Sequence, residues 1–160
     1  MQDDRITTIY DEVSGGAELL RWFGCVPTFH DAEVISLTLN RSGSSKLVLH
    51  GWLMTNEVDA DGYFMLDKHA VVTFELSGIM DLQLEGFTAQ NVLGRLILRR
   101  APDRPERRPH MTLSPLREDI EIELEPCYGL FGLIRARSVS ISIEPGRPGA
   151  QQAVEETREI

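Results

Sequence analysis

The sequence predicts a mainly β protein: an antiparallel β-sandwich or strongly curved antiparallel sheet with one short N-terminal helix. Two observations carry this prediction. From residue 33 onward, apolar residues recur at every second position in short runs separated by turn residues, the period of half-buried strands. Only one earlier stretch has apolar residues at helical spacing. With 160 residues and no internal repeat, we expect a single domain over residues 1–145 and a tail over 146–160 that is frayed or a short helix.

The helix is predicted over residues 17–23. Leu19, Leu20 and Phe23 fall on one face, Ser14 or Gly15 can cap its start, and Gly24 ends it. Residues 5–13 are expected to add a short edge strand.

The strands follow in order. Glu33–Arg41 alternates cleanly, and the return strand 46–54 is apolar on both faces, which favours a central position. Ser77-Gly78 reads as a tight turn between two alternating runs. The apolar phase slips near Arg137-Ser138, which predicts a β-bulge. The other expected strands cover 70–76, 80–85, 91–99, 119–125 and 134–143.

Two segments are expected to be loops. Residues 56–67 are acidic and begin like a calcium-binding loop, but Lys68 stands where the closing carboxylate is needed, so a solvated turn is predicted. The Pro- and Arg-rich residues 100–109 are expected to form a long exposed loop without regular structure.

Composition limits the classes of partner and the compartment. The net charge of -9 repels nucleic acid and anionic membranes and attracts a basic protein. No apolar run is long enough to span a bilayer and no secretion signal is visible, so a cytoplasmic location is expected. Cys25 and Cys127 lack metal or redox spacing and are expected to be buried free thiols, and no cofactor is predicted.

The alternating acids of residues 119–125 predict an acidic sheet face that binds a partner. If neighbouring strands join it, the face includes carboxylates from the 80–85 run; the alternative is a solvated face that only keeps the protein soluble. The candidate partner-binding residues are Glu121, Glu123, Glu125, Asp81 and Glu85.

A second cluster, Pro27, Phe29, His30, Asp31 and Glu33, precedes the first long strand. We expect it to be a structural motif in which His30 and Asp31 hydrogen-bond backbone groups at the strand entry. The alternative is a small metal-dependent enzyme or ligand-binding domain centred on His30, Asp31 and Glu33. No catalytic residues and no metal ligands are assigned, because no nucleophile motif and no metal-ligand spacing is present.

Three stretches carry a family resemblance: Trp22 to Leu37, with its Pro-Thr-Phe-His-Asp-Ala-Glu-Val core, the following Thr38 to Arg41, and Tyr128 to Ile141. Together they resemble the immunity protein 50 family of bacterial polymorphic toxin systems. The resemblance implies a small cytoplasmic protein that binds a cognate toxin and blocks it without catalysis. An acidic inhibitor suits a basic toxin. A third possibility is a structural domain that forms a homodimer or larger homo-oligomer.

Overall fold

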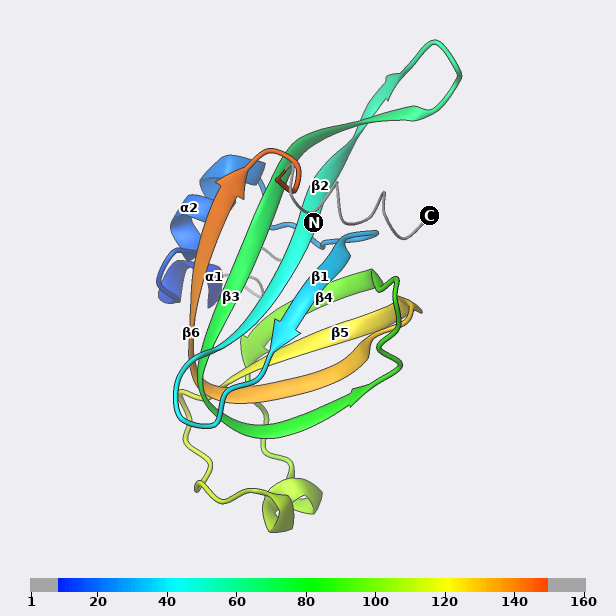
Figure 1. Cartoon of the computed structure of the whole chain (residues 1–160). Helices are drawn as coiled ribbons and strands as arrows, with labels where there is room; N and C mark the ends of the chain where they lie inside the picture. Colours follow the sequence, from blue (N-terminus) through cyan, green and yellow to red (C-terminus); the bar gives the residue numbers. More distant parts are fainter. Residues whose placement is uncertain (1–8, 150–160) are drawn as a thin grey trace.

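The computed structural model describes residues 9–149, in which six antiparallel strands close into a barrel in the order β1-β2-β3-β6-β5-β4 (Figure 1). The predicted mainly β class, with a strongly curved antiparallel sheet, is confirmed. The strands are β1 (Glu33–Thr38), β2 (Ser45–Val58), β3 (Phe64–Glu85), β4 (Val92–Arg100), β5 (Ile120–Tyr128) and β6 (Phe131–Pro145).

Two short helices, α1 (Ile9–Glu12) and α2 (Gly16–Phe23), precede the barrel (Figure 1). α2 packs against β6, and α1 contacts α2 and β4. The predicted helix is confirmed with one more residue at its start. Gly24 adopts a positive φ of 74° and donates its N–H to the carbonyl of Leu20, which ends α2. The expected edge strand is wrong over residues 9–12, which are helical, and its first residues lie outside the described range.

The predicted Ser77-Gly78 turn is wrong, because β3 runs through it as one strand of 22 residues. The buried cross-strand pairs Leu76–Val139 and Ile79–Ala136 are three residues apart on each strand instead of two. Residues three apart point to opposite faces of a regular strand, so β3 and β6 both change the face they bury here. Gly78, at φ 66°, lies at this change. β3 and β6 therefore contribute side chains to the core on both sides of this change, from opposite faces of each strand.

The change of buried parity in β6 is present, since Ala136 and Val139 are both buried, but the predicted β-bulge near Arg137-Ser138 is wrong, because the pairing with β3 is regular there. The register irregularity itself lies in β3, between Ile79 and Asp81. Beyond it Leu82 points inward as expected, because it lies opposite the buried Ile134, but 36% of the residue is exposed.

Both predicted loops contain regular structure. β2 and β3 continue past the barrel as a two-stranded ribbon, residues 54–67, that we call the arm. Residues 101–119, called the strap, contain the 3-10 helix η2 (Pro105–His110). Figure 1 shows the arm and the strap at opposite ends of the molecule.

Three further expectations concern termini, cysteines and membranes. Cys25 and Cys127 are free but both exposed, so the prediction of buried thiols is wrong. Of the predicted tail, residues 150–160 lie outside the described range. Among residues 9–149, no helix has the length and apolar character needed to cross a bilayer.

Candidate protein-binding surface

The predicted structural motif closes the barrel between β1 and β4. Glu33 pairs with Val92, and the backbone N–H groups of Asp31 and Leu93 donate to the carbonyls of Leu93 and Ala32 at 2.9 Å each. These bonds are made by the backbone and not, as expected, by the side chains of His30 and Asp31. The motif therefore belongs to the framework of the fold.

Two apolar members of the motif anchor it in the core. Pro27 is buried, and Phe29 is 2% exposed with its ring edge-on to those of Phe23 and Phe74, at centroid distances of 5.8 and 6.0 Å. A Cβ at Gly51 would lie 2.9 Å from the Phe29 ring, so a glycine in β2 makes room for this aromatic.

The polar members of the motif lie at the surface. His30 and Glu33 are exposed, and His30 Nδ1 lies 3.2 Å from an oxygen of the half-buried Asp31. Among residues 9–149, no three His, Cys, Asp or Glu side chains are arranged to hold a metal ion. The alternative of a metal-dependent site at His30, Asp31 and Glu33 therefore gains no geometric support.

Two other histidines meet on the outer face of β2 and β3. His50 Nε2 lies 3.0 Å from His69 Nδ1, and Trp52 packs beside both rings. Burial, together with the neighbouring charges of His69 and Arg147, lowers the pKa of His50 to about 4. His50 is therefore neutral at pH 7.

The predicted acidic face is a row of alternating charges. Pairing places Asp81 opposite Arg135, Arg135 opposite Glu121, and Glu121 opposite Arg99, across β3, β6, β5 and β4. The expectation that Glu121 and Asp81 point into solvent is wrong, because these residues are 1% and 8% exposed. β6 lies between β3 and β5, so the two predicted groups of carboxylates are separated by an arginine.

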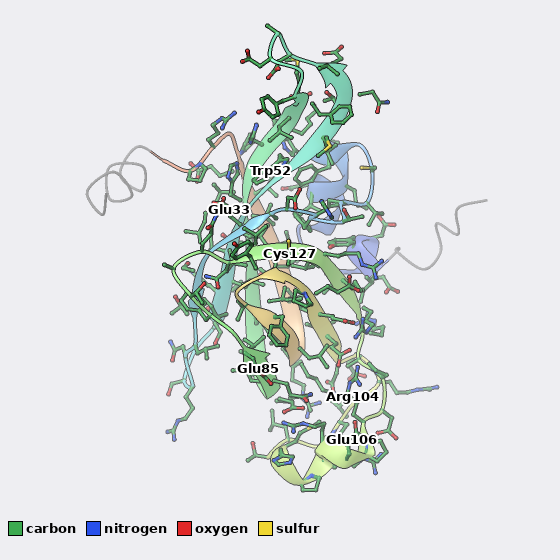
Figure 2. All side chains as sticks on the ribbon, turned by 90° about the vertical axis from the view of Figure 1, so that its right-hand side faces the viewer. Glu33, Trp52, Glu85, Arg104, Glu106 and Cys127 are labelled. Atoms are coloured by element: carbon green, nitrogen blue, oxygen red, sulfur yellow. The ribbon has the colours of Figure 1, made fainter. Side chains whose placement is uncertain are left out.

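The strap covers this charge row. Arg104 donates two hydrogen bonds to the carboxylate of Glu121, at 2.8 and 3.0 Å, and Arg107 donates two to Asp81, at 2.9 and 2.7 Å. Arg135 donates to the carbonyl of Pro102. In Figure 2, Arg104 points from the strap toward the barrel.

Asp119, at the end of the strap, is fully buried. Its carboxylate accepts hydrogen bonds from Arg135, Arg137 and the N–H of Leu116. Burial by itself raises the pKa of Asp119, but these three donors outweigh it and hold the pKa below the usual value. The same balance, with Arg104 and Arg99 as donors, lowers the pKa of Glu121.

The remaining predicted acids are half-buried or exposed. Glu123 lies 2.8 Å from Arg99, and Glu125 lies 2.7 Å from Arg95. Glu85 is exposed at the end of β3 (Figure 2). Four of the five predicted partner-binding carboxylates are thus neutralised by arginines, and partner binding by this group stays a prediction.

Glu85 also lines a shallow groove of about 360 Å³ between β1 and the end of β3. Its other lining residues are almost all apolar. They are Leu37, Leu39, Leu82, Leu84, Gly86, Phe87 and Leu130.

Exposed apolar side chains gather on the arm. The arm's large apolar residues are between 41% and 72% exposed, whereas core residues of the same strands are fully buried. Contiguous exposed apolar surface of this kind marks an interaction site. These residues are Met54, Val58, Tyr63, Phe64, Met65 and Leu66.

Four of these side chains share one face. Met54 lies directly opposite Leu66, and Val58 lies directly opposite Phe64. Leu66 and Phe64 are two residues apart on β3, so both pairs point to the same side of the ribbon. We call Met54, Val58, Phe64 and Leu66 the apolar face.

The apolar face continues onto the barrel. Trp52 precedes Met54 by two residues on β2, so its half-buried ring lies on the same side of the strand, next to His50 and His69. Trp52 lies at the base of the arm in Figure 2.

Neither strand of the arm has an outer neighbour among the described residues. β1 pairs with β2 only as far as His50, and β6 pairs with β3 only as far as Ala70. A two-stranded ribbon alone is marginally stable in water, and its free edges can accept another strand.

The arm also carries carboxylates. Glu57, Asp59, Asp61 and Asp67 are all exposed, and none of the ion pairs formed within residues 9–149 includes them. Asp59 shapes the turn, because its Oδ1 accepts the N–H groups of Asp61 and Tyr63.

Sequence reasoning assigned the arm to a solvated turn. The signal against that interpretation was present: the run Tyr63-Phe-Met-Leu66 is too apolar and too rich in strand formers for an idle loop. The acids around it obscured this signal.

Comparison with known proteins gives no further lead: no family model, no curated protein and no solved structure matches the chain.

Proposed function

We propose that the protein is a non-enzymatic binding protein of the immunity type, which neutralises a cognate bacterial toxin by covering it with the arm. The observation that carries the proposal is the set of six large apolar side chains that the arm holds in solvent. The resemblance to the immunity protein 50 family supports the choice of a toxin as the partner.

Protein interfaces use the residue types that the arm exposes. Aromatic residues and methionine are enriched in them, and a few such side chains supply most of the binding energy. On the arm, Tyr63, Phe64 and two methionines are available without any rearrangement of the barrel. Binding would also order a ribbon that has little support of its own.

The experiment co-expresses the full chain with the toxin-domain polypeptide encoded beside its gene. We expect the two to copurify and the chain to restore growth. Phe64→Ser should weaken the complex about 30-fold, the effect of a hot-spot residue. The matched control is Phe87→Ser, because Phe87 is 59% exposed against 56% for Phe64 but lies on the β3–β4 connection.

Tyrosine offers a second matched pair. Tyr63 in the arm is 72% exposed, and Tyr128 at the end of β5 is 64% exposed. Tyr63→Ser should weaken binding, whereas Tyr128→Ser should leave it unchanged. The proposal fails if the neighbouring polypeptide does not bind, or if arm variants and their controls bind equally.

A further inference from the structure

We infer, on the basis of the proposed function, that the arm's partner presents a cationic surface around an apolar cleft. The cleft takes the apolar face of the arm, and the cationic surface meets the carboxylates that surround that face.

The distribution of ion pairs between barrel and arm supports this inference. In the barrel, the buried carboxylates Asp81, Asp119 and Glu121 are each held by at least one arginine. The four carboxylates of the arm are in none of the ion pairs of residues 9–149. Their negative charge is therefore open to a partner.

Lys68, the single basic residue of positions 54–68, does not cancel this charge. Lys68 has its Nζ 4.9 Å from the centre of the Trp22 ring, on α2, and its backbone carbonyl accepts the Trp22 indole N–H. Residues 54–68 thus sum to -4 + 1 = -3, from Glu57, Asp59, Asp61 and Asp67 against Lys68.

The arrangement of the arm separates the two kinds of contact. The apolar face lies along one side of the ribbon. Asp67 is one position after Leu66 on β3, so it points away from that face, and Glu57 directly precedes Val58 on β2. Asp61 lies in the turn. A partner that buries the apolar face brings its rim close to these acids, where opposite charge speeds association.

The same charges argue against other occupants. A second copy of the chain would bring an equally acidic arm against this one, and anionic lipid or nucleic acid would be repelled. A cationic protein surface is the occupant that the charges favour.

The experiment measures association and dissociation rates of the full chain with the neighbouring toxin-domain polypeptide, at about 0.1 M and about 1 M NaCl, where the screening lengths are about 10 and 3 Å. The test variant combines Glu57→Gln, Asp61→Asn and Asp67→Asn. Asp59 is left intact because it builds the turn. The matched control combines Glu106→Gln, Glu118→Gln and Glu144→Gln, which removes the same charge from exposed sites outside the arm.

We expect the test variant to associate about 10-fold more slowly at low salt, with a smaller difference at high salt. The control variant should associate as the unchanged chain does. Phe64→Ser should instead speed dissociation, because it removes buried contact.

Binding that depends on Phe64 but not on salt or on the three carboxylates would overturn the inference that the partner is cationic. It would leave the proposed function standing. Two other results would also overturn the inference. One is an arm-dependent homodimer of the chain in sedimentation. The other is arm-dependent binding of the chain to vesicles of phosphatidylcholine and phosphatidylglycerol. If the neighbouring polypeptide does not bind at either salt concentration, the proposed function and the inference resting on it both fail.

Discussion

The arm and the strap leave the barrel at opposite ends and differ in what they leave exposed. The strap places its charges inward: Arg104 and Arg107 reach buried carboxylates of the barrel. The arm places apolar side chains outward and has no charged partner within residues 9–149. A long segment that leaves a barrel must still find partners for its backbone hydrogen-bonding groups and for its charged and apolar side chains. The strap does so within the molecule, whereas the arm leaves its large apolar side chains in solvent, where the proposed partner would cover them.

The largest expected effect tests the ion pairs between the strap and the barrel. Asp119→Ala should lower the free energy of unfolding by about 3–5 kcal/mol, because Arg135 would remain buried without its partner. Guanidinium unfolding measures this loss. Asp103→Ala is the control, since it removes an exposed pair with Arg108 and should change stability by less than about 0.5 kcal/mol. Equal losses in the two variants would show that the buried pair of Asp119 and Arg135 does not stabilise the fold more than an exposed pair does.

Acid should loosen the barrel and strap in two stages. The pKa of His50 is about 4 in the fold, below its usual value of 6.5. As the pH falls from 6.5 to about 4, the unfolded chain therefore binds a proton at His50 that the folded chain does not, and the free energy of unfolding decreases. Hydrogen bonds from Arg107 lower the pKa of Asp81, and Asp119 and Glu121 are lowered as well. Their stabilisation is complete above the usual values of 3.8 and 4.5 and is lost as pH falls through the lower folded values.

Unfolding midpoints in urea from neutral pH downward measure both stages. His50→Asn should reduce the loss in the upper range, where His69 also has a lowered pKa, and Asp119→Ala should reduce the loss in the lower range. A midpoint that stays constant from pH 6.5 down to about 4 would contradict the His50 assignment, and one that stays constant as the pH falls further below 3.8 would contradict the carboxylate assignment.

Proteolysis gives a local comparison. Chymotrypsin should cut first after Tyr63 and Phe64, because no further strand within residues 9–149 pairs with the arm and it opens at little cost. Trypsin should cut slowly after Arg107, whose side chain is bound to the buried carboxylate of Asp81. Mass spectrometry of early fragments checks the order. Early cuts after Arg107 with an intact arm would reverse the comparison.

The smallest expected effect is on the stability of the arm variants. Phe64→Ser should change the free energy of unfolding by less than about 0.5 kcal/mol, since the ring is already 56% exposed. Phe74→Ala, ten residues further along β3, should cost about 3–5 kcal/mol because that ring is fully buried. A large loss in Phe64→Ser would mean that the arm supports the barrel and is not reserved for a partner.

The sequence predicted the strand content and the short helix, because both follow from local spacing. Leu19 and Phe23 face the core as their helical period requires, and Ile120, Ile122 and Leu124 are buried as alternation requires. Closure into a barrel was not predicted, since it depends on hydrogen bonds between the backbone near residue 31 and β4 that no local pattern encodes.

The candidate site was harder to predict for a related reason. Alternation correctly placed Glu121 on the face opposite Ile120 and Ile122, but what covers that face depends on strand order. Only the insertion of β6 between β3 and β5 sets Arg135 between Asp81 and Glu121. The arm was missed because its acids suggested a loop, whereas its apolar residues pair across two strands.

β3 carries the arm at one end and Asp81 near the other. If β3 slipped by one position against its neighbours, alternation would turn Asp81 toward the apolar interior and away from Arg107. The same slip would rotate Phe64 and Leu66 to the reverse side of the ribbon. Burial of Asp81 beneath the strap therefore disfavours this misaligned register of β3, and with it an arm whose apolar face lies on the reverse side.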